Sequence, residues 1–86
     1  MNLRLRVMTP TALVFDGPVA SVVAPGAWGY LGILDHHRPL ATPLVSGNLV
    51  FRTEQGQRLL RVDGGFLEVH RNLVTVLADS AQAPKS

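Results

Sequence analysis

The stretch FLEVHRNLVTVLA, residues 66–78, decides the fold of this chain. It contains two runs of aliphatic and β-branched side chains, residues 66–70 and 73–78, which favour β-strands. Arg71 and Asn72 separate the two runs, and asparagine tolerates the left-handed backbone that a two-residue hairpin turn requires. The stretch therefore predicts a tight β-hairpin.

The same alternation of residue types marks the first strand and a second hairpin. Leu3, Leu5 and Val7 alternate with two arginines, which predicts one apolar face and one solvated face that carries guanidinium groups. Residues 48–53 and 57–62 flank a three-residue loop that ends in a glycine, the residue best suited to positive φ. Both patterns are those of half-buried strands.

Turn-forming residues divide the segments in between. Short strands are predicted at residues 12–15 and 19–24, on either side of a turn at residues 16–18, and Pro25-Gly26 is predicted to end the second strand. Strands at intervals of about 8–12 residues, with turns between them, are typical of an all-β sandwich or barrel. The alternation predicts that its core contains Phe51, Phe66, Leu67, Val74 and Val76.

Length and composition limit the classes of protein to consider. A chain of 86 residues forms one domain. With 47% hydrophobic and 16% charged residues, it has more apolar surface than a solitary domain needs, which favours a partner. The formal net charge is +2 and the basic residues are scattered, so no patch for phosphate is predicted. Without cysteine, a disulfide and a thiolate zinc site are excluded.

The only helical signal lies near the end of the chain. Asp79-Ser80 is a candidate N-cap pair, and Pro84 interrupts the helix that would follow it. We therefore expect one β domain over residues 1–79 and a tail over residues 80–86, in which a helix starts and is not continued.

Residues 23–40 are the candidate functional segment, because glycines and prolines punctuate an apolar run that also contains two histidines. The segment is predicted to be a shaped surface loop, which would serve as a docking surface or a binding site. Trp28 could belong to the core, but its position beside a glycine favours a partly exposed anchor.

The residue pattern gives little support to a catalytic site or a metal site. Neighbouring histidines on a strand point to opposite faces, so Asp35-His36-His37 is better explained as turn or interface residues than as a metal site. Gly29 and Gly32 resemble a phosphate cradle only in spacing, since no helix N-terminus follows them. We find no nucleophile and base at interpretable spacing, and we predict no catalytic residue, no metal and no cofactor.

The chain resembles the N-terminal domain of the epsilon subunit of rotary F-type ATP synthases, on short pieces that occur in order over residues 3–79. These pieces are Val14-Phe15-Asp16-Gly17, Ser21-Val22-Val23-Ala24-Pro25-Gly26, Gly29 with Gly32-Ile33-Leu34, His37 with Pro39-Leu40, Gly64-Gly65-Phe66-Leu67-Glu68-Val69, and Asn72 with Val74-Thr75-Val76-Leu77-Ala78-Asp79. No single piece identifies the family, but the common order and spacing of the pieces do.

The resemblance implies a flattened two-sheet β-sandwich of short antiparallel strands. It implies a non-catalytic rotor subunit in the central stalk, which binds the gamma subunit and the polar loops of the c-ring and couples proton or sodium flow to ATP synthesis. Such a subunit is peripheral on the cytoplasmic face of a bacterial inner membrane and reaches the membrane only through the complex. The implied contacts with the c-ring or gamma fall on Trp28, Gly29, Tyr30, Leu31, Gly32, His37 and Pro39.

The chain departs from the family pattern at its candidate contacts and at its end. Trp28 and Tyr30 stand where many members carry acidic residues, so an aromatic contact is expected. The family's C-terminal helical hairpin would begin near Asp79, and we expect a short form without it. The alternative to the rotor function is a small β-barrel that binds single-stranded nucleic acid, which would need an exposed platform of aromatic rings.

Overall fold

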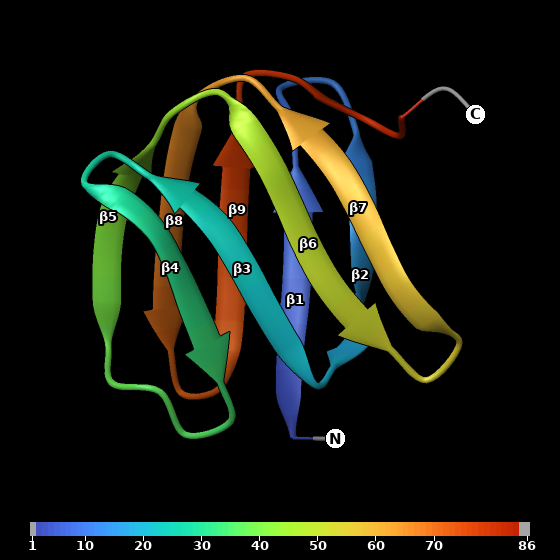
Figure 1. The fold of residues 1–86 in the computed structure, drawn as a ribbon, viewed down its shortest axis with the longest axis vertical. Coiled ribbons are helices and arrows are strands. Elements are labelled where there is room, and N and C mark those ends of the chain that lie inside the picture. The colour runs from blue at the N-terminus through green and yellow to red at the C-terminus, as the bar shows by residue number, and fades with distance from the viewer. Residues whose placement is uncertain (1, 85–86) are drawn as a thin grey trace.

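The computed structural model describes residues 2–84, and these residues form ten β-strands and no helix (Figure 1). The all-β prediction is confirmed. The strands are β1 (Leu3–Met8), β2 (Leu13–Val19), β3 (Ser21–Gly26), β4 (Gly29–Leu34), β5 (Leu40–Leu44), β6 (Gly47–Thr53), β7 (Gly56–Val62), β8 (Gly65–His70), β9 (Leu73–Ala78) and β10 (Ala81–Gln82).

Hydrogen bonds join the strands into one sheet in the order β10-β7-β6-β3-β5-β8-β9-β1-β2, and β4 pairs with β3 outside that path. The sheet folds over on itself into two layers. In the view of Figure 1, β4, β3, β6 and β7 lie in front of β5, β8, β9, β1 and β2. All pairs are antiparallel except β1 and β9, which run parallel.

Both predicted hairpins are present. β8 and β9 are joined by Arg71 and Asn72, whose φ angles of 49° and 61° are those of a hairpin turn with two left-handed residues. β6 and β7 are joined at Thr53 and Gly56, which pair with each other, and Gly56 has the expected positive φ of 117°. The loop between the paired residues is thus two residues long, one fewer than predicted.

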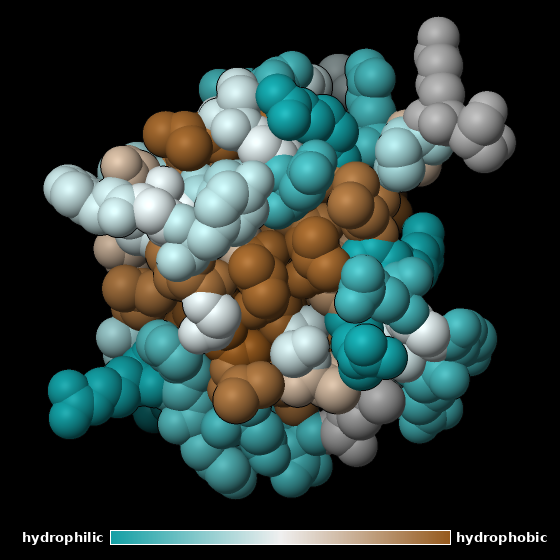
Figure 2. All heavy atoms as spheres, in the orientation of Figure 1, coloured by the Kyte–Doolittle hydropathy of each residue, from teal (hydrophilic) through white to brown (hydrophobic). Residues whose placement is uncertain are grey.

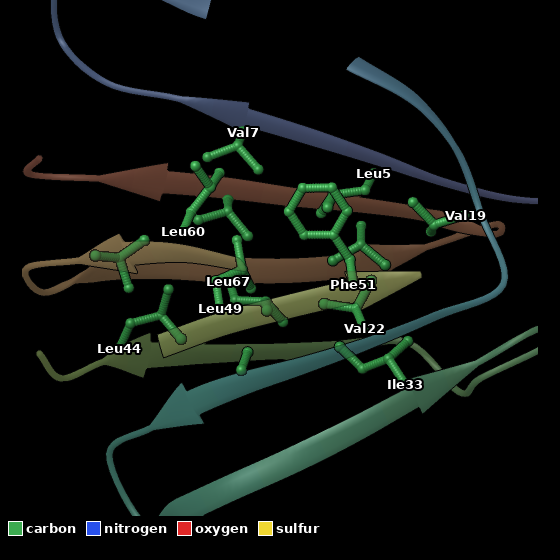
Figure 3. Packing of buried hydrophobic residues seen from close by; sticks show 14 of the residues in the cluster. Leu5, Val7, Val19, Val22, Ile33, Leu44, Leu49, Phe51, Leu60 and Leu67 are labelled. Carbon is green, nitrogen blue, oxygen red and sulfur yellow. The ribbon is translucent and has the colours of Figure 1, made fainter. Parts of the chain in front are cut away.

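The core lies between the two layers, where side chains from both point toward one another (Figure 3). Leu5 and Val7 of β1 and Leu49 and Phe51 of β6 point into this space from the two layers, and all four are essentially inaccessible to solvent. The prediction that Phe66 is a core residue is wrong. Its neighbour Leu67 is fully buried, and because successive side chains on a strand point to opposite faces, Phe66 lies outside and is 42% exposed. The other predicted core residues, Phe51, Leu67, Val74 and Val76, are buried.

Two predicted turns are in fact strand. Residues 16–18 lie within β2, where Pro18 pairs with Arg4, because β2 is the last strand of the sheet and an edge strand tolerates a proline. Pro25 and Gly26 continue β3. Pro25 lies beyond the part of β3 that pairs with β6, which ends at Val23, so it does not interrupt that ladder.

The predicted start of a helix after Asp79-Ser80 is also wrong, because residues 81 and 82 form β10. Ala81 pairs with Val62 of β7, and the Asp63 N–H donates to the Ser80 carbonyl at 3.0 Å. The Ser80 hydroxyl, which would have capped the helix, donates instead to Asp63 Oδ2 at 3.0 Å. Residues 85 and 86 of the predicted tail lie outside the described residues.

Candidate partner-binding site

Residues 23–40 form a β-hairpin and a short loop, not one long loop as predicted. β3 and β4 pair from Ser21 with Leu34 to Gly26 with Gly29. Gly29 has a φ of 122°, which closes the turn around Trp28. The glycines therefore shape a hairpin, and the contact residues predicted on a loop lie mostly on β4.

The β3–β4 turn and the neighbouring connection between β5 and β6 expose a group of large side chains, which we name the tryptophan end: Trp28, Tyr30 and Val45. Trp28 is 87% exposed, so its assignment as an exposed residue is confirmed. Tyr30 is 60% exposed, yet its hydroxyl accepts a hydrogen bond from the Asn48 N–H at 3.1 Å. The tyrosine ring is thus held across the start of β6 while its face remains available.

Leu31 and Gly32 differ in what they can offer to a partner. Leu31 is half-buried and packs against the core, so it supports the hairpin from inside. Gly32 faces outward, and a Cβ atom built there would meet nothing within 4 Å. Of the two, only Gly32 leaves room for a partner to approach the backbone.

His37 and Pro39 lie at the other end of β4, in a segment that we name the histidine loop, residues 35–39 (Figure 1). His36 takes a φ of 63°, and the His37 N–H donates to the Leu34 carbonyl at 3.2 Å. A strand of six residues spans about 20 Å. Of the seven predicted contact residues, Trp28, Gly29 and Tyr30 therefore lie at one end of the sandwich and His37 and Pro39 at the other, with Leu31 and Gly32 between them on β4.

A shallow groove adjoins the histidine loop. It is lined by Pro39, Leu40, Ala41, Glu68, Val69 and His70, from β5, β8 and the end of the loop. On the same outer face, Pro43, Phe66 and Leu77 occupy neighbouring positions on β5, β8 and β9. Phe66 and Leu77 are 42% and 52% exposed, so an apolar row extends from the groove across this face. Sequence reasoning missed it by assigning Phe66 to the core.

The opposite outer face carries its own apolar band. Figure 2 shows hydrophobic atoms gathered across the middle of the layer that contains β3, β6 and β7. The register places Val23 beside Val50, and Val50 beside Leu59, in one row across these strands. Each layer of the sandwich thus presents apolar side chains to solvent.

An ion network joins β1 to β2. Arg4 Nε lies 2.8 Å from Asp16 Oδ1, and Arg6 Nε lies 3.5 Å from Asp16 Oδ2. The hydrogen bond from Arg4 lowers the pKa of the Asp16 carboxyl below its ordinary value, and the charges of both arginines add to the effect. The two arginines predicted to be solvated are therefore part of a surface ion network.

A metal site and a nucleic-acid-binding surface were also considered from the sequence. Among residues 2–84, no cluster of three histidine, cysteine or acidic residues could hold a metal ion. The exposed aromatic rings of the described residues are dispersed, since Trp28 and Tyr30 lie at one end and Phe66 lies on an outer face. Nor does that part of the chain contain a helix long and apolar enough to span a membrane.

The described residues thus form an all-β sandwich that exposes aromatic side chains at one end and the histidine loop at the other. Comparison with known sequences identifies the family. The chain belongs to the family described as ATP synthase, Delta/Epsilon chain, beta-sandwich domain, whose profile matches residues 2–84.

Curated relatives agree with this assignment. The ATP synthase epsilon chain of Moorella thermoacetica is 44% identical over 82 residues, which cover 94% of this chain and 61% of that protein. The epsilon chain of Desulforamulus reducens is 47% identical over 81 residues, covering 92% and 60%. The chain thus spans about three fifths of the length of these relatives.

Solved structures support the fold. A chain in the Euglena gracilis mitochondrial ATP synthase, in a structure of OSCP, F1 and the c-ring, matches with a TM-score of 0.87 and 23% identity, over 94% of this chain and 52% of that one. A chain in the central stalk and c-ring of the Tetrahymena thermophila mitochondrial enzyme matches with a TM-score of 0.77 and 20% identity, over 96% and 67%.

Proposed function

We propose that this chain is the β-sandwich domain of a non-catalytic epsilon subunit, which links the gamma subunit to the c-ring in the central stalk of an F-type ATP synthase. In that position it is peripheral on the cytoplasmic face of a bacterial membrane and supports the coupling of proton or sodium flow to ATP synthesis. The epsilon-chain relatives support the assignment. The observation that carries the linking role is that the tryptophan end and the histidine loop lie at opposite ends of one rigid domain.

The tryptophan end is the surface that we assign to the polar loops of the c-ring. It projects from a turn, so short loops can reach it without disturbing the sheet. Trp28 and Tyr30 supply large contact areas at low entropic cost, because each side chain has few rotatable bonds. An aromatic contact of this kind depends less on salt than a contact between charged groups.

The outer face of β5, β8 and β9, from the histidine loop to Phe66 and Leu77, is the surface that we assign to gamma. A stable interface buries about 800 Å² on each partner, which a single loop cannot supply. The groove beside Pro39 and the apolar row of Phe66 and Leu77 extend the histidine loop over three strands. Together they offer a contact with an apolar centre and polar margins.

A sandwich suits this role mechanically. Its core side chains are packed between two hydrogen-bonded layers, so a load applied at one end is carried to the other with little deformation. Six of the eight consecutive strand pairs in the sheet path share three or more register positions, so most of the sheet is held by extended ladders.

The test is a binding experiment with purified gamma and with c-rings in detergent, using variants that separate the two surfaces. We expect Trp28→Ala to weaken binding to the c-ring and to leave binding to gamma unchanged. Phe66→Gln should have the reverse effect. Val23→Gln, on the opposite outer face, is the matched control for Phe66→Gln, since both residues are about 40% exposed on a strand.

Three results would contradict the proposal. Binding of neither gamma nor the c-ring by the folded wild-type chain would remove the linking role. Loss of gamma binding in Val23→Gln, with Phe66→Gln unaffected, would move the gamma surface to the other face. Tight binding of a single-stranded oligonucleotide that Trp28→Ala abolishes would favour the nucleic-acid alternative.

A further inference from the structure

The histidine loop is tied to a distant turn by one side chain. The His36 N–H donates to Asn72 Oδ1 at 2.8 Å, and Asn72 Nδ2 donates to Asp35 Oδ1 at 2.6 Å. Asp35 Oδ2 in turn lies 3.5 Å from His36 Nε2. The carboxamide of Asn72 thus uses its acceptor and its donor on two consecutive residues of a loop that precedes it by more than thirty positions in the sequence.

Within residues 2–84, these are the only hydrogen bonds that join the histidine loop to another part of the fold. The His37 N–H bonds to Leu34, the last residue of β4, and His37 Nδ1 lies 2.7 Å from the carbonyl of the next residue, Arg38. Both contacts are local. The orientation of the loop relative to β8 and β9 therefore depends on Asn72.

The backbone of the turn restricts which residue can do this. Asn72 has a φ of 61°, which glycine, asparagine and aspartate accept most readily. Glycine has no side chain to reach the loop. Aspartate could accept from the His36 N–H, but its carboxylate would face the carboxylate of Asp35. Asparagine alone among the three satisfies the turn, the amide and the carboxylate together.

We propose that Asn72 is a positioning residue for the gamma surface: it fixes the histidine loop, and so the place of His37 and Pro39, without contacting gamma itself. This inference rests on the proposed function. The turn between β8 and β9 then has two roles, since it closes the hairpin and also sets the loop at the margin of the neighbouring groove.

The test compares Asn72→Gly with Arg71→Gly. Both variants keep a residue that accepts positive φ in the same turn, but only the first removes the contacts with the loop. We expect Asn72→Gly to speed hydrogen exchange at the His36 N–H and to weaken gamma binding by roughly tenfold, the effect of losing two surface hydrogen bonds. Arg71→Gly should change neither, and the two variants should unfold at similar urea concentrations.

A charge swap supplies a readout that simple destabilisation would not produce. Asn72→Asp should weaken gamma binding at neutral pH, because it places a second carboxylate opposite that of Asp35. Adding Asp35→Asn to Asn72→Asp restores one donor facing one acceptor and leaves the net charge of the pair unchanged. This double variant should bind gamma as the wild-type chain does at neutral pH.

The outcomes separate this inference from the proposed function. If the wild-type chain fails to bind gamma, the proposed function falls and the positioning role falls with it, whatever the exchange data show. If the wild-type chain binds gamma but Asn72→Gly binds equally well, only the positioning role is refuted. Equal loss of binding in Arg71→Gly, or no recovery in the charge swap, would likewise refute it.

Discussion

The substitution Gly47→Ala tests how Tyr30 is held at the tryptophan end. Gly47 is buried beneath the tyrosine, and a Cβ atom at this position would lie 2.7 Å from Tyr30 Oη and 2.8 Å from Pro25 Cβ. Its backbone does not have the positive φ that disfavours alanine, so strain in the dihedral angles plays no part. The added methyl group must therefore displace the tyrosine hydroxyl, the proline ring or both.

The expected cost follows from these two contacts. Crowding a packed site costs about 1–3 kcal/mol, and losing the hydrogen bond from the Asn48 N–H to Tyr30 Oη costs about 1 kcal/mol. We expect Gly47→Ala to lower the free energy of unfolding by about 3 kcal/mol, the sum of the two costs. For a domain of this size, that shifts the urea midpoint by about 2 M. Binding to the c-ring should weaken as well, because Tyr30 no longer occupies its place.

Tyr30→Phe provides the control, since it removes the hydroxyl and keeps the ring. In the Tyr30→Phe background, Gly47→Ala should cost about 1 kcal/mol less than in the wild-type chain, because only the contact with Pro25 remains. Urea titrations of the four proteins measure this difference. The reasoning is refuted if Gly47→Ala costs the same in both backgrounds, or if the Asn48 amide resonance is unchanged by Gly47→Ala.

Two further predictions concern stability. Gly65→Ala should destabilise the domain by more than about 3 kcal/mol in urea titration, since Gly65 has a φ of 123° and its Cβ would lie 2.7 Å from Ala78 Cα, whereas Gly32→Ala should cost under about 1 kcal/mol. Similar midpoints for the two alanine variants would contradict this. Asp16→Asn should lower stability near neutral pH, and its difference from the wild-type chain should shrink as pH falls below 3.8 through the lowered pKa of Asp16, where the native carboxylate also loses its charge. A difference that persists in acid would show that Asp16 acts through something other than its charge.

The sequence predicts those parts of the fold that local chemistry controls. The hairpin at Arg71 and Asn72 follows from an asparagine between two β-branched runs, and the structure places both residues at positive φ. The errors occur where the conformation of a segment depends on which strands pair with it. Pro18 and Pro25 signal turns in isolation, but each lies in a strand because the ladder beside it is absent or has ended. A single chain does not reveal which strands will be edges.

Phe66 shows the same limit for burial. The prediction from alternation assigns both Phe66 and Leu67 to the core, although neighbouring residues on a strand point to opposite faces; in β8 the inward positions belong to Leu67 and Val69. Counting the period from Leu67 would have predicted an exposed phenylalanine. The interaction of Asn72 with the histidine loop is different in kind: no sequence pattern connects residues so far apart, and only the fold brings them together.

The division of the candidate site follows from strand geometry. If these contiguous residues formed a compact loop, they would make one patch. In a helix they would span about half the distance that they span in a strand, because a helix rises 1.5 Å per residue and a strand rises about 3.3 Å. Here β4 is extended, so its six residues cover about 20 Å of a domain whose largest dimension is 29 Å. Trp28 and Pro39 therefore reach opposite ends of the molecule although only ten residues separate them. Under the proposed function, substitutions at the Trp28 end of this segment should affect binding to the c-ring, and substitutions at its His37 and Pro39 end should affect binding to gamma.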